Sequence, residues 1–303
     1  MKRLVQLPRF PELQNFLVMN IIYDELTNAF LDYDCEISIV NNLDELRNEG
    51  IIFLDNGALW RGNRDILNKI GEKCPDAVYY CWYWCDLPSY IPYEDYQPFK
   101  YMIYIGNNIL KMPSIPELIN EYHNYKPSKK FCPLKLRANE HPDLVGTYKR
   151  DVTRDYCFMG GGYKQQWVPE EFTGIYHHVT NDNYLSYNTR RDIYLSSLFA
   201  FGFHGDFPID CGSISQRVFE GLAYGCVVLC DNPVAEQITN GIVVTVTSKE
   251  DLIEKMKYYK QHPELIIEKQ QKGYEWVKKY GTNRESIRVF LEKLKELYNI
   301  EFD

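Results

Sequence analysis

The chain has 303 residues, of which 45% are hydrophobic and 25% are charged. This balance is typical of a folded globular protein, and the length suits two domains of roughly 150 residues each. The formal net charge of -8 gives no basic field that would concentrate DNA, RNA or an anionic membrane around the protein, so composition argues against a nucleic-acid partner.

No segment predicts a membrane crossing. The longest run of apolar or aromatic residues, 78–85, is far shorter than the ~20 residues that a helix needs to span a bilayer. Pro8, Arg9 and Pro11 interrupt the apolar stretch that a signal peptide would require. The nine cysteines are scattered without a disulfide framework. These features together predict a cytoplasmic protein.

The first half of the chain alternates short apolar runs with amphipathic segments. We expect strands at 4–7, 36–40, 51–54, 77–84 and 101–105, and helices at 13–30, 42–48 and 65–70. Such alternation favours a parallel sheet with both faces covered, whose ligands bind beyond the carboxyl ends of the strands. Residues 126–150 contain three prolines and no clear period, which predicts a linker. We therefore expect a Rossmann-like domain over 1–150.

The same pattern starts again after residue 150. We expect strands at 156–159, 174–179, 195–203, 226–230 and 242–246, a helix near 169–172, and closing helices at 249–261, 263–279 and 283–298. This order predicts a second α/β domain over 151–303. Its three closing helices suggest a chain that returns across both domains, and two such domains imply a cleft.

The segment 211–231, CGSISQRVFEGLAYGCVVLCD, carries most of the chemistry. Ser213, followed three residues later by Gln216, is a capping box that predicts a helix beginning at Ile214. Gly225 should end this helix at the C′ position. The N-terminus of such a helix presents free N–H groups and the positive end of its dipole, which suits a diphosphate.

The side chains of this predicted helix fall on two faces. Val218 and Leu222 are four residues apart and share a face that should pack against the domain. Arg217 and Glu220 are three residues apart and share a face that should look into the cleft. Arg217 would add a planar, permanent charge there. Spacing alone leaves open that Arg217 and Glu220 form an ordinary surface ion pair.

Ser215, Arg217 and residues 219–225 resemble a pattern of the GT-B glycosyltransferases, and most closely of their CgeB-like branch within the glycosyl transferases of group 1. That pattern is a serine, an arginine two residues on, and an aromatic-Glu-x-Leu-Ala-x-Gly run that leads into a strand. The resemblance covers about residues 156–297. It implies two Rossmann-like domains that face across a cleft, with a nucleotide-diphosphate sugar bound in the C-terminal half and a glycan or glycoconjugate hydroxyl as acceptor.

The resemblance also implies roles for single residues. Ser215 and Arg217 would bind the donor. Glu220 would hydrogen-bond its ribose or sugar hydroxyls, because a carboxylate can accept two of them together. Many retaining relatives carry a second glutamate eight residues earlier, where this sequence has Gly212. That departure argues against a retaining mechanism.

A glycine-rich loop directly after the strand at 156–159 is the second candidate for donor binding. Gly160, Gly161 and Gly162 would let backbone N–H groups approach phosphate oxygens, and Lys164 would neutralise the leaving diphosphate. The loop lacks the full G-x-G-x-x-G spacing, so an ordinary turn is the alternative. His204 follows another strand, where related enzymes approach the donor; a solvated loop is the alternative there.

An inverting transfer needs a general base from the N-terminal domain. Histidine is scarce in that domain, where His123 is the first. Asp55 directly follows the apolar run 51–54, at a carboxyl strand end, so we expect it to be the catalytic base. A simple Asp-Asn-Gly turn is the alternative, and Asp86 is the second choice of base.

Two other patterns are not expected to bind a metal. Asp32-Tyr33-Asp34 resembles an acidic metal-binding motif but precedes a strand instead of following one, which favours a solvated loop. Cys81 and Cys85 have no companion pair at zinc-site spacing. We expect no metal and no cofactor beyond the sugar nucleotide.

Two rival functions remain open at this level. A nucleotide-sugar epimerase or a fucosyltransferase-like enzyme uses the same scaffold, and a fold by itself does not establish activity. A catalytically silent module that binds sugar nucleotides or glycans is favoured by the departure at Gly212.

Overall fold

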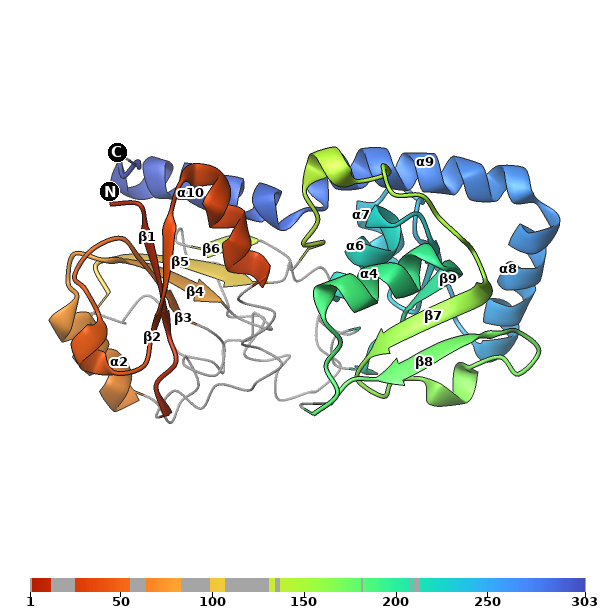
Figure 1. Ribbon diagram of the computed structural model, residues 1–303, viewed down its shortest axis with the longest axis horizontal. Helices are drawn as coiled ribbons and strands as arrows, with labels where there is room; N and C mark the ends of the chain where they lie inside the picture. Colours follow the sequence, from red (N-terminus) through yellow and green to blue (C-terminus); the bar gives the residue numbers. More distant parts are fainter. Residues whose placement is uncertain are drawn as a thin grey trace, which may run out of the picture. The chain divides into compact units, whose positions relative to one another are not determined.

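The computed structural model describes residues 2–11, 25–54, 64–82, 99–106, 131–133, 137–180, 182–206, 209 and 213–302. The chain separates into two compact units, each built around one sheet (Figure 1). Unit 1 comprises Met1–Lys135 together with Ser286–Asp303, and unit 2 comprises Leu136–Glu285. The two sheets confirm the predicted pair of Rossmann-like domains.

Unit 1 contains a six-stranded parallel sheet in the order β2-β1-β3-β4-β5-β6. Its strands are β1 (Leu4–Pro8), β2 (Glu36–Val40), β3 (Ile51–Leu54), β4 (Val78–Trp82), β5 (Tyr101–Gly106) and β6 (Phe131–Pro133). The helical segments of unit 1 include α2 (Arg64–Lys73), most of α10 (Asn283–Tyr298), and the 3-10 turns η2 (Asn28–Tyr33) and η3 (Leu43–Glu45).

The two faces of this sheet are covered by segments far apart in sequence. Successive side chains of a strand point to opposite faces. Tyr79 of β4 packs in the cluster that contains α2, whereas its neighbour Tyr80 packs on the other face. There Phe290 of α10 is fully buried, with its ring 4.7 Å from that of Tyr80 and 6.2 Å from that of Phe30. The last helix therefore completes the core of unit 1.

Unit 2 contains a five-stranded parallel sheet in the order β11-β10-β9-β7-β8. Its strands are β7 (Arg154–Gly160), β8 (Gly174–His178), β9 (Ser197–Gly202), β10 (Val227–Cys230) and β11 (Val244–Thr245). Its helices are α4 (Tyr187–Leu195), α6 (Gln216–Ala223), α7 (Pro233–Ile238), α8 (Lys249–Gln261) and α9 (Pro263–Tyr280), with the 3-10 turns η6 (Pro142–Leu144) and η7 (Gln165–Trp167).

The alternation of β7 divides the core of unit 2 into two layers. Cys157 and Met159 belong to the cluster that includes Leu222 of α6. Tyr156 and Phe158 belong to the opposite cluster, which includes helix α8. Both faces of the sheet are thus buried, as the α/β pattern predicts.

The domain boundary differs from the one expected after residue 150. It falls between Lys135 and Leu136. Residues 137–150 of the predicted linker belong to unit 2, because Ala138 and Val145 are fully buried in its core and Arg150 donates hydrogen bonds to the carbonyls of Ser197 and Gly225. Part of the same stretch, Phe131–Pro133, adds edge strand β6 to unit 1.

Three predicted helices need correction. The helix expected at 42–48 is reduced to the single turn η3, and the one near 169–172 is absent, since the turn lies earlier, at η7. Of the helix expected at 13–30, the structure describes residues 25–30, where one helical turn leads into η2. Helix α4 was not predicted, because its buried residues include Arg190 and Tyr194, so it lacks a purely apolar stripe.

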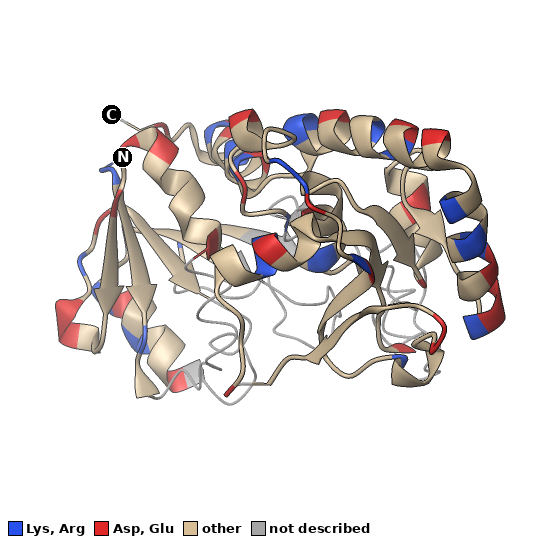
Figure 2. Cartoon of the chain, turned by 45° about the vertical axis from the view of Figure 1, so that its right-hand side comes forward, with Lys and Arg blue, Asp and Glu red and all other residues tan. Residues whose placement is uncertain are grey.

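Acidic and basic residues alternate along α8 and α9 (Figure 2). Many form local ion pairs, such as Lys255 with Asp251 at 2.8 Å. Neither of these two helices carries charges of only one sign. None of the described helices combines the length and apolar composition that a membrane crossing requires.

Candidate functional site

The sheet of unit 2 reverses its direction of growth at β7. The next strand in sequence, β8, pairs with one side of β7, and β9 pairs with the other side. In open parallel sheets, ligands bind outside the carboxyl ends of the strands at such a switch point. The loops that follow β7 and β9 begin at Gly161 and Phe203, so the predicted glycine loop and His204 both lie at this edge.

The glycine loop owes its composition to close neighbours. Gly160 is buried at the end of β7, and a Cβ on it would collide with the guanidinium of Arg217. A Cβ on Gly161 would lie 2.8 Å from the ring of Tyr163. Gly162 is exposed. The first glycine therefore lets Arg217 approach the strand end, which an ordinary turn would not require.

Lys164 closes this loop in a left-handed conformation with φ of 56°. Its ammonium lies 3.5 Å from the carboxylate of Asp206, in the loop after β9, and 5.3 Å from the centre of the Trp167 ring. The Asp206 side chain is 93% exposed and the Lys164 side chain 21%, so the carboxylate faces water and the pair is held weakly.

Arg217 joins the ends of β7 and β9. Its Nε donates to the carbonyl of Met159 at 3.1 Å, and its Nη1 donates to the carbonyl of Phe203. The guanidinium also lies 5.2 Å from the centre of the Phe158 ring. Burial lowers the pKa of Arg217, but arginine stays charged at neutral pH. Nη2, the group nearest Gly160, bonds to no acceptor within the described part of the chain.

His204 is buried, with 3% of its surface exposed, so the alternative of a solvated loop is wrong. Its Nδ1 lies 2.8 Å from Asp231 Oδ1, and its backbone N–H donates to Asp231 Oδ2 at 2.8 Å. Its Nε2 accepts from the Ser215 N–H at 3.1 Å and lies 3.0 Å from Ser215 Oγ. Burial lowers the pKa of His204 although Asp231 opposes this. Because Nε2 accepts from the Ser215 N–H, we assign a neutral ring with its hydrogen on Nδ1.

Helix α6 begins two residues later than predicted. Its first residue is Gln216 and its N-cap is Ser215, whose side chain caps no N–H because Oγ lies beside His204. The end of the helix agrees with the prediction, since Gly225 follows it with φ of 77°. Val218 is fully buried, as the apolar face requires.

Glu220 is a buried counter-ion. It accepts a bond from Arg190 Nη2 at 3.0 Å and another from the Tyr194 hydroxyl at 3.3 Å, and 5% of its side chain is exposed. The alternative of a surface pair with Arg217 is therefore wrong. The expectation that Glu220 faces a cleft is also corrected, because α4 covers it. Its role in binding donor hydroxyls stays a prediction.

His204, Cys230 and Asp231 bring atoms of metal-ligand type within 4.8 Å of one another, among the residues that the structure describes. Each is already engaged by the protein. Cys230 Sγ donates to the carbonyl of Gly202 at 3.1 Å, and burial raises the pKa of this thiol. Because the imidazole and carboxylate bond directly to each other, the cluster is a hydrogen-bonded unit.

Of the remaining residues named in the sequence analysis, some are described by the structure and others lie outside its described part. Asp34 is an exposed residue that pairs with Arg3 at 3.0 Å, which agrees with a solvated loop. The residues that lie outside the described part of the chain include Asp55, Asp86, His123, Cys85 and Gly212.

Two residues of the site were missed. Asp231 directly follows strand β10, which is the same strand-end signal that selected Asp55. Arg190 carries no comparable signal, because its partner lies 30 positions away on another helix.

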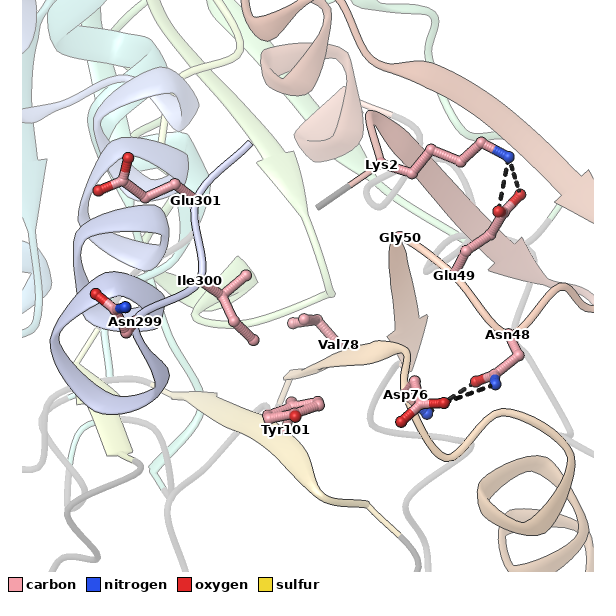
Figure 3. A pocket seen from close by; sticks show the side chains of 10 residues that line it. All are labelled: Lys2, Asn48, Glu49, Gly50, Asp76, Val78, Tyr101, Asn299, Ile300 and Glu301. Carbon is pink, nitrogen blue, oxygen red and sulfur yellow. Dashed lines mark hydrogen bonds and ion pairs between the residues drawn. The ribbon is translucent and has the colours of Figure 1, made fainter. Parts of the chain in front are cut away.

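Unit 1 has a hollow of about 730 Å³ at the amino edge of its sheet (Figure 3). It lies where β1, β3, β4 and β5 begin, and its polar side chains pair with one another, as Lys2 does with Glu49 at 2.6 Å. Parallel sheets bind ligands at carboxyl ends, so this hollow is not the candidate site. Its other lining residues are Asn48, Gly50, Asp76, Val78, Tyr101, Asn299, Ile300 and Glu301.

Residues 140–292 match the model of a family described as glycosyl transferase-like. The match spans 153 of the 303 residues, just over half of the chain. The chain belongs to this glycosyl transferase-like family. It is therefore a glycosyltransferase by family. No curated protein matches the chain in sequence.

Solved structures place this glycosyltransferase in the GT-B fold. An alpha-glucosyltransferase in complex with UDP-glucose and DNA containing an abasic site has a TM-score of 0.62 and 9% identity, covering 97% of this chain and 99% of that one. An alpha1,3-fucosyltransferase has a TM-score of 0.46 and 12% identity, covering 97% and 91%. The first likeness shows a shared fold; the CgeB-like branch stays a prediction.

Proposed function

We propose that this glycosyltransferase takes its sugar from a nucleoside-diphosphate sugar held at the carboxyl edge of the unit 2 sheet, and transfers it to a hydroxyl of a glycan or glycoconjugate. The main observation behind the proposal is that the glycine loop, Arg217 and Ser215, the residue before α6, all lie at one switch point of the sheet. Such an edge is where open parallel sheets bind nucleotides.

The diphosphate is the part of the donor that this edge suits best. Gly161 and Gly162 leave the backbone N–H groups of the loop uncovered by side chains of their own. Arg217 Nη2 supplies a fixed positive donor. Lys164 can exchange its weak pair with Asp206 for a phosphate oxygen, since an exposed ion pair contributes about 0.2–1 kcal/mol. These cations would neutralise the leaving diphosphate, so we propose transfer without a metal ion or cofactor, with activity unchanged by EDTA.

Glu220 remains our candidate for the hydroxyls of the donor. Each of its carboxylate oxygens accepts one bond within the protein. An ionised carboxylate has about four acceptor positions, so two remain, and a donor hydroxyl reaches them only where α4 uncovers Glu220. Asp55 remains the proposed general base. Asp55→Asn should abolish transfer while leaving nucleotide affinity intact, and a fully active variant would remove Asp55 from the mechanism.

For the acceptor we propose a glycan or glycoconjugate in preference to DNA. The glucosyltransferase neighbour was solved with DNA, but this chain has a net charge of -8 and mixes both signs along α8 and α9 (Figure 2). DNA binding relies on clustered basic residues. We also propose a cytoplasmic location, which the buried free thiols support: Cys35, Cys74, Cys157, Cys226 and Cys230.

Calorimetric titration with UDP, GDP, ADP, dTDP and CMP tests the donor site. We expect one nucleotide to bind and Lys164→Ala to weaken it about tenfold, the equivalent of 1.4 kcal/mol. Lys257→Ala is the matched control, because Lys257 also forms an exposed pair, with Glu171 at 2.6 Å, but on α8. Binding of none of the five nucleotides would refute the proposal. Binding without turnover of the matching sugar nucleotide would indicate the silent module instead.

A further inference from the structure

A chain of hydrogen bonds runs from β10 through the loop after β9 to the start of α6. Asp231 holds both the backbone and the ring of His204, each at 2.8 Å. The His204 ring then holds Ser215 through its N–H at 3.1 Å and its Oγ at 3.0 Å. The side chains of His204 and Asp231 are 3% and 2% exposed, whereas Ser215 is partly exposed.

This burial separates the roles of the three residues. His204 uses Nδ1 on Asp231 and Nε2 on Ser215, so neither ring nitrogen remains for a ligand. Ser215 is the member that reaches the surface. Its hydroxyl would ordinarily cap α6, but it is drawn toward His204 instead.

Asp231 also determines which nitrogen of the His204 ring carries the hydrogen. A carboxylate beside Nδ1 stabilises the Nδ1–H form and leaves Nε2 as an acceptor. In the other form, the hydrogen on Nε2 would point at the N–H of Ser215, only 3.1 Å away. Two hydrogens would then face each other, and the segment before α6 would have to move.

We propose that His204 and Asp231 are positioning residues, which fix Ser215 at the carboxyl edge for contact with the diphosphate of a sugar nucleotide. The inference rests on the proposed function. It corrects the expectation that His204 itself touches the donor, because His204 acts through Ser215.

Two substitutions at one position separate positioning from simple packing. His204→Asn keeps an N–H near the place of Nδ1 and so keeps the bond to Asp231. His204→Gln keeps a carbonyl oxygen near the place of Nε2 and so keeps an acceptor for Ser215. Both remove the same ring, so both should lower the melting temperature to a similar extent. We expect His204→Asn to weaken binding of the nucleoside diphosphate that wild type prefers among UDP, GDP, ADP and dTDP about tenfold or more, and His204→Gln about threefold or less.

Asp231→Asn supplies a second route if either histidine variant fails to fold. Its shape is unchanged, but its amide would face Nδ1 and move the ring hydrogen to Nε2, the effect known for triad aspartates. We expect Asp231→Asn to weaken nucleotide binding about as much as His204→Asn does. Ser215→Ala is the reference for the loss that follows when the Ser215 hydroxyl itself is removed. Equal nucleotide affinity in both histidine variants, or unchanged affinity in Asp231→Asn, would overturn the inference. In either case, nucleotide binding by wild type would still uphold the proposed function. Binding of none of UDP, GDP, ADP, dTDP and CMP to wild type would overturn the proposed function and the inference with it; binding of CMP alone would overturn the inference.

Discussion

The buried pair of Arg190 and Glu220 predicts a large loss of stability when either of the two charges is removed. Their side chains are 7% and 5% exposed. Glu220→Gln would remove the buried carboxylate from beside a guanidinium that cannot lose its proton. Removing one partner of a buried pair costs about 3–5 kcal/mol. Arg190 keeps bonds to the Tyr184 hydroxyl and the Leu185 carbonyl, each at 3.0 Å, so we expect about 3 kcal/mol for Glu220→Gln.

A double-mutant cycle tests whether this cost arises from the pair. Arg190→Met leaves Glu220 with the Tyr194 hydroxyl at 3.3 Å, so we expect about 4 kcal/mol. The double variant should cost about 2–3 kcal/mol less than the sum of the two. Urea unfolding of the three variants and wild type gives these values. The exposed pair of Lys257 and Glu171 is the control, with a coupling below about 1 kcal/mol. Additive losses at Arg190 and Glu220 would refute the reasoning.

Three further outcomes follow from other parts of the structure. Gly225→Ala should lower the free energy of unfolding by about 1–2 kcal/mol or more, because Gly225 has φ of 77° and a Cβ would collide with the Tyr274 hydroxyl; unchanged urea unfolding would contradict this. Burial tends to raise the pKa of Asp155, but the Lys260 ammonium and the hydrogen bonds from Thr173 together outweigh it and hold that pKa below its ordinary value. Asp155 therefore stabilises the fold above about pH 4, and stability is lost as pH falls through the lowered pKa, so Asp155→Asn should flatten the acid end of the stability profile. Burial lowers the pKa of His204 against the opposing effect of Asp231, so below about pH 6.5 the unfolded chain takes up a proton that the folded chain does not. Stability should fall with pH there, and His204→Gln should show a smaller fall; equal slopes between about pH 7.5 and 5.5 would exclude a neutral His204.

Local pattern predicted the strands and the closing helices well. Helices α8 and α10 have the expected bounds, because a serine cap, a His-Pro break and Gly281 separate periodic segments. Long-range contacts explain the failures. The start of α6 moved from the predicted Ile214 to Gln216, so that Ser215 takes the N-cap place expected for Ser213, and the Ser215 hydroxyl lies beside His204, eleven residues away. Residues 126–150 were taken for a linker because they contain three prolines and no clear period, a pattern that gives no sign that Val145 is buried in unit 2.

The candidate site was predictable where its members sit at strand ends. Gly160, Arg217 and Ser215 were named from local pattern and resemblance, and the structure brings them to one edge of the sheet. The partner of Glu220 was not predictable, since Arg190 belongs to a different helix and ordinarily signals an exposed face. Which charge a buried carboxylate meets depends on how helices pack, and no local spacing encodes it.

The return of the last helix to unit 1 has a consequence for the order in which the protein folds. Unit 2 is one continuous stretch of chain, so all of its core residues are available once residue 285 has been synthesised. Unit 1 must wait for Phe290, which fills the space beside Phe30 and Tyr80. The domain that is translated first is therefore the one that is completed last. Until then, aromatic rings that are buried in the finished domain are exposed to solvent. Aggregation is therefore most favoured during this interval.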